Sequence, residues 1–268
     1  NLKRRETTIL KTWRLLKDKN YDGITNMAID KAISIACGEG KFATTLRLYG
    51  WKSPTISIGY SQRAEPDINL HYCNLAGIEI VKRPTGGRAV LHENELTFSI
   101  NTSLENPLFP KNILKSHKKI SEALLIGLCN LGVKAKLQYK SKKQTSKHPV
   151  CFSAPSIYEL IVDGKKIVGC AQRRFRKSFL EHGSLPLTLD RCKLASIFRN
   201  DLSSSEKKLG SLPFENMAGL NEIGAASFSF DQIVENILKG FEQCFEITFN
   251  EETLSDYEIE LANNKLKH

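Results

Sequence analysis

Residues 82–100 constrain the fold of this chain most, because they place a pair of glycines between two stretches with the alternation of β-strands. The first stretch runs into Pro84, and the second extends over residues 96–100. Gly86 and Gly87 can adopt positive φ and let the backbone approach a ligand closely. A hairpin turn is the ordinary use of a Gly-Gly pair, but the whole string predicts a binding loop.

The side chains around these glycines suit a polar or carbonyl ligand. Arg83 and Arg88 flank the pair, and His92 follows. A guanidinium can meet a carboxylate, a phosphate or an acyl carbonyl, or it can form a framework salt bridge. A histidine here can act as an acid–base group or as a structural hydrogen-bonding residue. All three are candidate substrate-binding residues, together with Gly86 and Gly87.

Composition and charge exclude several classes of protein. The 268 residues are 41% hydrophobic and 25% charged, as in globular proteins, and can bury a substantial core. No apolar run approaches the ~18 residues of a membrane span, so we expect a soluble protein without a membrane partner. The formal net charge of +10 favours acidic partners, either nucleic acid or an acidic carrier protein. Because no helix-turn-helix or zinc signature accompanies the charge, we expect no nucleic acid.

Seven cysteines are scattered along the chain without CxxC pairs. Their odd number and their spacing disfavour both disulfides and a zinc site, and they favour a reducing compartment. We therefore predict a cytoplasmic protein that holds no metal. Cys37, Cys129 and Cys244 lie on apolar helical segments, where we expect inert, buried thiols.

Periodicity in the first half of the chain predicts an α+β organisation. The expected strands cover residues 7–16, 45–49 and 55–60, the last two joined as a hairpin. The expected helices cover residues 26–36, 66–75 and 112–131. Gly132 is expected to end the last of them.

In the second half, three strands are expected at residues 157–162, 166–172 and 178–187. Asp163-Gly164 predicts a tight turn between the first two, which makes antiparallel pairing the expectation. Helices are expected near residues 229–246 and 251–265. We place the main domain at residues 1–200 and a C-terminal helical extension of the same domain at residues 201–268.

Cys151 lies at the junction between the basic loop 140–148 and an expected strand. Lys165 and Lys166 follow one hairpin turn later, so Lys166 can approach the sulfur if the hairpin folds back. A nearby ammonium lowers the pKa of a thiol and raises the thiolate fraction that a nucleophile needs. An inert buried thiol is the ordinary alternative. Cys151 and Lys166 are the candidate catalytic residues.

Two groups of residues carry a resemblance to known proteins. Residues 82–92 resemble the Arg-Arg-x-x-Gly-Gly segment, ending in His, that lines the acyl-binding tunnel of the lipoate and biotin protein ligase superfamily. Residues 151–160, 163–174 and 182–185 resemble LipM-type octanoyltransferases, whose matching cysteine is an acyl-accepting nucleophile. The resemblance implies the fold of the superfamily, a mixed, mostly antiparallel sheet with flanking helices, and makes residues 1–200 a catalytic acyltransferase domain.

The resemblance also implies an activity in two steps. Cys151 would take an octanoyl group from octanoyl acyl carrier protein as a thioester and pass it to a lysine of a lipoyl domain, either glycine-cleavage H protein or an E2 subunit. Thioester exchange is nearly isoenergetic, so neither ATP nor another cofactor is expected. His182, Gly183 and Ser184 would bind the substrate, with His182 orienting the loop around the acyl carbonyl; a structural histidine is the alternative for His182. We expect a monomer.

Three other functions remain open at this stage. An ATP-dependent lipoate-protein ligase would use Lys166 on the acyl-adenylate and leave Cys151 incidental. An amidotransferase would move octanoyl between protein lysines and would also use the cysteine. A basic nucleic-acid-binding module is the alternative without catalysis.

The sequence departs from the family pattern near the expected site, above all at Glu181 and Cys170. Glu181 stands where the family tends to have Gln, and a carboxylate aimed at the thiol would raise the pKa of that thiol. Cys170 replaces a small residue and offers a second nucleophile, although its strand position favours the core. The aromatic residues Tyr49, Trp51 and Tyr60 are expected in the core or in the tunnel wall.

Overall fold

A six-stranded mixed sheet forms the centre of the computed structural model, which describes residues 11–65, 67–139, 157–198, 214, 216–223 and 227–266. The strand order is β10-β11-β6-β2-β1-β12. The strands are β1 (Lys11–Lys17), β2 (Thr45–Tyr49), β6 (Glu95–Ser103), β10 (Gly169–Arg174), β11 (Ser178–Pro186) and β12 (Ile247–Glu252). β1 pairs in parallel with β2 and β12, and the other three pairings are antiparallel. The predicted fold class is confirmed.

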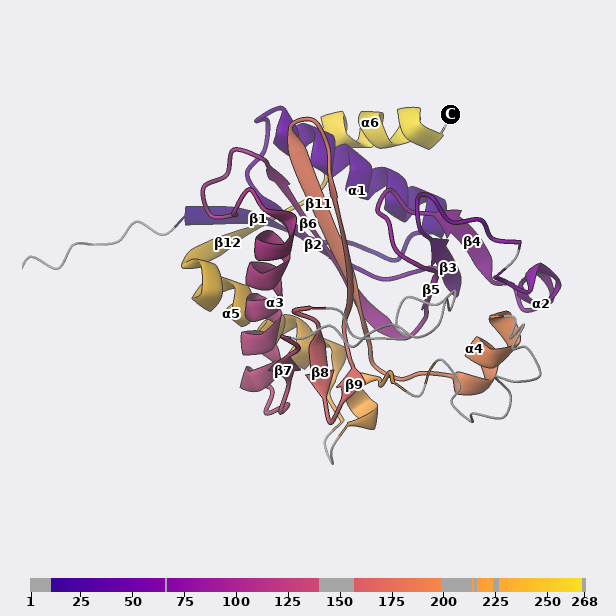
Figure 1. Ribbon diagram of the computed structural model, residues 1–268. Helices are drawn as coiled ribbons and strands as arrows, with labels where there is room; N and C mark the ends of the chain where they lie inside the picture. The colour runs from indigo at the N-terminus through magenta and orange to yellow at the C-terminus, as the bar shows by residue number, and fades with distance from the viewer. Residues whose placement is uncertain are drawn as a thin grey trace, which may run out of the picture.

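Two pairs of helices pack on this sheet (Figure 1). These are α3 (Ile113–Asn130) with α5 (Phe230–Phe245), and α1 (Gly23–Gly38) with α6 (Asp256–Leu266). Neighbouring strand residues point to opposite faces, so in β1 Trp13 and Leu15 join the core under α3 and α5, whereas Leu16 packs with α1 and α6. α3 ends as predicted, because Gly132 follows with a φ of 81°.

Two smaller sheets complete the architecture. The first has the order β4-β3-β5, and α2 and α4 share its hydrophobic core. Its elements are β3 (Thr55–Ile58), α2 (Leu70–Leu75), β4 (Glu79–Lys82), β5 (Val90–His92) and α4 (Arg191–Ile197). The second has the order β7-β8-β9. It consists of β7 (Lys136–Leu137), β8 (Leu160–Val162) and β9 (Lys165–Lys166), and the short 3₁₀ helix η2 (Leu220–Glu222) follows later in the chain.

The structure corrects two of the predicted strand arrangements. The predicted hairpin of residues 45–49 and 55–60 is wrong, because β2 pairs with β1 and β6 while β3 belongs to the second sheet. The single strand predicted at 166–172 is two strands in different sheets, β9 and β10. The turn at Asp163-Gly164 is confirmed, with φ values of 48° and 79°.

The C-terminal segment contributes a strand that the sequence did not predict. β12 covers Ile247–Glu252 and pairs along β1, and α6 begins only at Asp256. Phe241, Phe245 and Ile247 lie in the same hydrophobic core as Trp13. The segment after residue 227 therefore adds a strand to the central sheet instead of being only helical.

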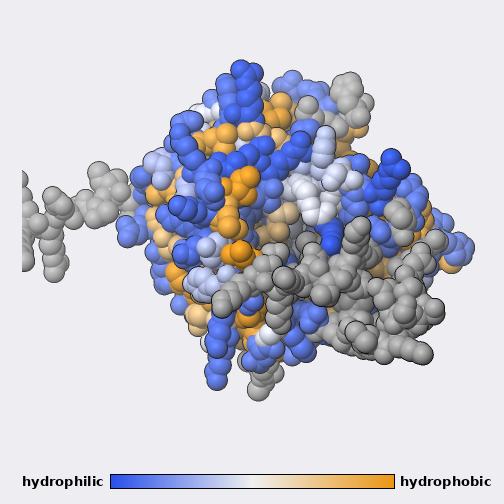
Figure 2. All heavy atoms as spheres, in the orientation of Figure 1, coloured by the Kyte–Doolittle hydropathy of each residue, from blue (hydrophilic) through white to orange (hydrophobic). Residues whose placement is uncertain are grey.

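Most of the face seen in Figure 2 is hydrophilic, with hydrophobic side chains gathered over α3. Ile113 and Leu114, at the start of that helix, are among its exposed apolar residues. Within the described part of the chain, no helix has both the length and the apolar character needed to cross a membrane.

Candidate active site

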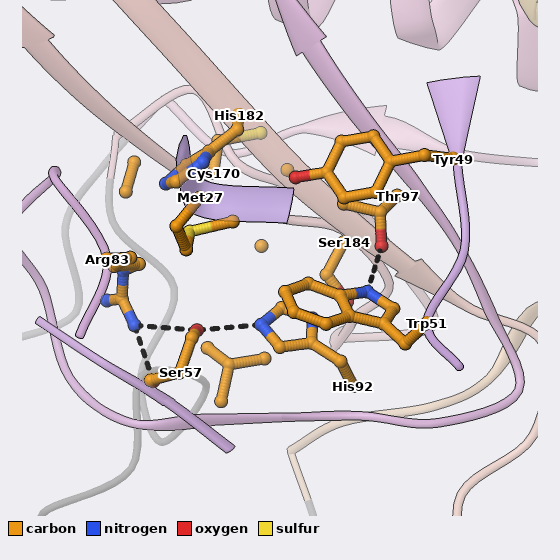
Figure 3. A pocket seen from close by; sticks show the side chains of 14 residues that line it. Met27, Tyr49, Trp51, Ser57, Arg83, His92, Thr97, Cys170, His182 and Ser184 are labelled. Carbon is orange, nitrogen blue, oxygen red and sulfur yellow. Dashed lines mark hydrogen bonds between the residues drawn. The ribbon is translucent and has the colours of Figure 1, made fainter. Parts of the chain in front are cut away.

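A pocket lies where the central sheet meets the β4-β3-β5 sheet, next to α1 (Figure 3). It holds about 380 Å³ of space not filled by atoms, part of it open to solvent. Five of the predicted substrate-binding residues line it: Arg83, His92, His182, Gly183 and Ser184. Its apolar walls include Met27, Tyr49, Trp51 and Val90. An apolar cavity with a few polar groups is the usual form of a small-molecule site.

Arg83 holds the Gly-Gly loop in place. Its guanidinium is buried and donates to the backbone carbonyls of Ser57 (2.7 Å), Gly86 (2.8 Å) and Arg88 (2.7 Å). These contacts give Arg83 a framework role through backbone carbonyls, a third arrangement beside the ligand contact and the salt bridge considered from the sequence. Gly86, Gly87 and Arg88 form the loop that it ties down, but they do not line the pocket themselves.

The loop packs directly on Gly59. Gly87 has a φ of 92°, and a Cβ at Gly59 would overlap the Gly87 carbonyl oxygen. A Cβ at Gly86 would meet no atom within 4 Å. The close backbone approach is therefore at Gly59, a residue that the sequence analysis did not single out.

We expect Gly59→Ala to destabilise the protein by about 1–3 kcal/mol, because backbone must shift to admit the methyl group. Gly86→Ala is the matched control and should unfold at nearly the wild-type denaturant concentration. Guanidinium titrations followed by circular dichroism measure both. Equal midpoints for the two variants would show that the loop does not pack as described.

His92 is held on three sides. Its Nδ1 lies 2.8 Å from the Glu95 carboxylate and its Nε2 lies 2.7 Å from Ser57 Oγ, while Trp51 stacks on the ring with centroids 4.1 Å apart. Because a carboxylate only accepts, Nδ1 carries a proton and donates to it. Ser184 Oγ also donates to Glu95. His92 and Ser184 thus belong to one network around a buried carboxylate.

His182 links the loop to α1. Its Nε2 lies 2.6 Å from Thr85 Oγ1, and its Nδ1 lies 3.4 Å from the Asp30 carboxylate. Burial lowers the pKa of His182, although the hydrogen bond to Asp30 opposes this effect. The neutral ring therefore dominates at neutral pH, with Nδ1 facing Asp30 as donor and Nε2 accepting from Thr85. This arrangement agrees with a loop-orienting role.

Lys166 lies outside this pocket, with its side chain fully buried. Its Nζ forms an ion pair of 2.5 Å with Glu159, just before β8. Its backbone N–H donates to the Asn216 carbonyl (2.7 Å). Cys151, the other predicted catalytic residue, lies outside the described residues.

Glu181 points away from His182, because successive residues of β11 face opposite sides of the sheet. Its buried carboxylate accepts from His117 Nδ1 (2.8 Å) and from Gln172 Nε2 (2.6 Å). Burial lowers the pKa of His117, but its hydrogen bond with Glu181 and the charge of that carboxylate raise it more, so the net change is upward. The negative charge that Glu181 adds relative to the family pattern is therefore offset locally by His117.

Comparison with known proteins agrees with this architecture. The family model of the lipoyl protein ligase A/B catalytic domain matches residues 22–242. The chain belongs to this family. Octanoyltransferase LipM of Carboxydothermus hydrogenoformans is 37% identical over 258 residues, covering 96% of each chain. Octanoyltransferase LipM of Clostridioides difficile is 37% identical over 253 residues, covering 93% of each. The predicted resemblance to LipM-type octanoyltransferases, which are acyltransferases, is confirmed.

Solved structures of the lipoyl protein ligase family show the same fold. Lipoate-protein ligase A bound with ATP superposes with a TM-score of 0.77 at 24% identity, covering 96% of this chain and 94% of that one. The bipartite lipoate protein ligase of Thermoplasma acidophilum gives a TM-score of 0.76 at 23% identity, covering 96% and 92%.

Several residues around the pocket were not predicted from the sequence. Asp30, Ser57 and Glu95 anchor its networks. Asp30 carried a usable signal, since it is a charged residue inside the apolar helix predicted at 26–36. Ser57 and Glu95 lie within or next to alternating strands, where polar residues are unremarkable.

The predictions for other side chains have mixed outcomes. Tyr49 and Trp51 line the pocket, as expected. Tyr60 is 57% exposed instead and packs against Arg173 at 4.2 Å, so its assignment to core or tunnel is wrong. Cys37 is buried as predicted, but Cys129 is exposed because it lies near the end of α3.

Proposed function

We propose that this chain transfers an octanoyl group from acyl carrier protein to a lysine of a lipoyl domain, through a thioester at Cys151. The observation that carries the proposal is the convergence of Arg83, His92 and His182 on one apolar pocket, in a chain that is 37% identical to a LipM octanoyltransferase over 96% of its length. Such a pocket suits a saturated acyl chain, which offers no hydrogen-bonding groups beyond its carbonyl.

In the first step, the Cys151 thiolate attacks the carbonyl carbon of the octanoyl thioester. A C–S bond forms to Cys151, the C–S bond to the carrier breaks, and the carrier thiolate takes up a proton. The Lys166 ammonium, held by its ion pair with Glu159, stabilises the Cys151 thiolate. Because one thioester replaces another, no ATP is consumed.

In the second step, the uncharged amine of a lipoyl-domain lysine attacks the octanoyl-enzyme. A C–N bond forms, the C–S bond to Cys151 breaks, the nitrogen gives up one proton to the solvent, and the Cys151 thiolate leaves. The acceptors we propose are glycine-cleavage H protein and E2 lipoyl domains. A cytoplasmic location and a monomeric state are part of the same proposal, and the net charge of +10 suits an acidic carrier.

The residues around the pocket have binding and positioning roles in this proposal. Arg83 and His182 fix the Gly-Gly loop through Thr85 and the loop carbonyls. His92 already has two hydrogen-bond partners and a stacked indole, which favours a role in shaping the pocket over proton transfer. Gly183 lines the pocket and leaves room for the neighbouring Phe98 ring, which a Cβ there would overlap.

Intact mass spectrometry of the protein with octanoyl acyl carrier protein, without ATP, tests the proposal. We expect one octanoyl adduct that hydroxylamine removes and that peptide mapping assigns to Cys151. Cys170→Ser is the matched control and should keep the adduct, whereas Cys151→Ser should lose it. Addition of H protein should then discharge the adduct onto a lysine.

Three outcomes would contradict the proposal. An adduct that persists in Cys151→Ser and disappears in Cys170→Ser would identify Cys170 as the nucleophile. No adduct, with lipoyl-AMP formed once lipoate and ATP are supplied, would identify a ligase. Loading from octanoyl-H protein but not from the acyl carrier protein would identify an amidotransferase.

A further inference from the structure

Behind the acyl pocket, three different metal-binding side chains converge from three elements. His117 comes from α3, Cys170 from β10 and Glu181 from β11, and their ligand atoms all lie within 4.8 Å of one another. Cys170 pairs with Gly183 and Gln172 with Glu181 in the β10–β11 ladder. Cys170, Gln172 and Glu181 therefore share the face of the sheet that His117 contacts.

The carboxylate at the centre of this cluster is buried and fixed in position. The Glu181 side chain is 0% exposed, and His117 and Gln172 each donate to one of its oxygens. A carboxylate excluded from water needs a compensating charge. A cation held between His117 and Glu181 would supply that charge in place of a His117 proton.

A second observation points to a ligand at the same place. The Oε1 atom of Gln172 is buried and has no hydrogen-bond partner among the described residues. Its orientation is dictated by Glu181, because a carboxylate accepts only from the amide NH₂ of Gln172, and this leaves Oε1 facing elsewhere. Buried carbonyl oxygens are rarely left unpaired. A bound ion, or a water on that ion, would pair this one.

The cluster is also accessible. His117, Cys170 and Gln172 line a cavity separate from the acyl pocket, with Leu114 and Glu159 on its wall. Cys170 lines the acyl pocket as well (Figure 3). An ion can therefore enter from the side of α3, and it would lie directly behind the acyl pocket.

We propose that His117, Cys170 and Glu181 form a binding site for Zn²⁺ or a similar borderline transition-metal ion. Imidazole, thiolate and carboxylate together are the donor set of such ions, whereas Mg²⁺ and Ca²⁺ prefer oxygen alone. Bond lengths of about 2.0–2.3 Å require small rotations of the three side chains. Binding displaces the Cys170 thiol proton and any proton shared by His117 and Glu181. The fourth coordination position of the ion is open to Gln172 Oε1 or to water.

No metal site was predicted from the sequence, because its cysteines show no CxxC spacing. These ligands are 53 and 11 residues apart and meet only through the pairing of β10 with β11 and the packing of α3. An ion here would also fix the wall that Cys170 contributes to the acyl pocket. The effect on octanoyl transfer rests on the proposed function, whereas binding of the ion does not.

Titration of the Cys151→Ser protein with Co²⁺ tests the site without any activity measurement. We expect a thiolate-to-cobalt charge-transfer absorption that saturates at one equivalent and is removed by one equivalent of Zn²⁺. Cys170→Ser should abolish the absorption, and His117→Gln and Glu181→Gln should each weaken Co²⁺ binding at least about 10-fold. Cys129→Ser and Cys192→Ser remove exposed thiols outside the cluster and should leave it unchanged.

A second measurement guards against variants that fold poorly. In the unmutated protein, Zn²⁺ should slow iodoacetamide labelling of Cys170 while labelling of Cys129 and Cys192 stays the same, as read by peptide mass spectrometry. No absorption in Cys151→Ser, an absorption that survives in Cys170→Ser, or unprotected Cys170 would each overturn the metal site. None of these results bears on whether Cys151 forms the octanoyl thioester.

Discussion

Lys166→Met lowers octanoyl transfer by about 10²- to 10⁴-fold in our expectation, the range usual for loss of a positioned proton-transfer or charge-stabilising group. Methionine keeps much of the length and volume of the lysine chain but carries no charge. Without the ammonium, the Cys151 thiol should ionise less at neutral pH. The measurements are the single-turnover rate from octanoyl acyl carrier protein and the pH dependence of Cys151 alkylation, which should move to higher pH in the variant.

Stability must be separated from chemistry in this test, because Lys166 and Glu159 form a buried ion pair. Removing one partner leaves a buried charge uncompensated, at a cost of about 3–5 kcal/mol. Lys166→Met combined with Glu159→Gln removes both charges and should recover most of that stability without recovering transfer. A double variant that regains transfer, or an unshifted alkylation profile in Lys166→Met, would make Lys166 structural only.

The alternating and helical patterns predicted most elements of the fold, but not how the strands are distributed among sheets. Thr45–Tyr49 and Thr55–Ile58 both have strand character, and a five-residue connection favours a hairpin. β2 instead pairs with β6 on one side and with β1 on the other. Pairing partners far apart in sequence decide this arrangement, and local periodicity carries no information about them.

The candidate site likewise has parts that the sequence could predict and parts that it could not. A loop at Gly86-Gly87 was predictable from the two flanking strand patterns, whereas its role in substrate binding stays a prediction, since the two glycines lie outside the pocket lining. Asp30 and Glu95 were not predicted as site residues, since part of their hydrogen-bond networks comes from elements far along the chain, Arg47 for Asp30 and Ser184 for Glu95. The Cys151 prediction rests on its sequence context, and the experiment with octanoyl acyl carrier protein tests it.

Asp30→Ala should lower the free energy of unfolding by about 3–5 kcal/mol. Asp30 is fully buried in α1 and accepts from Arg47 Nη1 (2.9 Å), Tyr49 Oη (2.9 Å) and Ser99 Oγ (2.8 Å). The substitution leaves the buried Arg47 guanidinium with one carboxylate fewer. Thermal unfolding followed by circular dichroism should show a midpoint lower by roughly 6–20 °C.

Tyr49→Phe is the matched control, because it removes one donor to Asp30 and leaves the ion pair with Arg47 intact. We expect it to cost about 1 kcal/mol. A smaller loss for Asp30→Ala than for Tyr49→Phe would contradict the central place of Asp30 in this network.

The pH dependence of the Asp30→Ala effect has a definite sign. Burial alone would raise the pKa of Asp30, but the hydrogen bond from His182 and the charge of Arg47 bring it below the ordinary value of 3.8. A carboxyl with a lowered pKa stabilises the fold fully above its unfolded value and loses that contribution as the pH falls through its folded value. The stability gap between wild type and Asp30→Ala should therefore not narrow between pH 7 and pH 5, and should narrow only below about pH 4. A gap that already closes between pH 7 and pH 5 would mean that the Asp30 carboxyl is protonated in the native pocket, and the hydrogen bond assigned to His182 Nδ1 would have to be reversed.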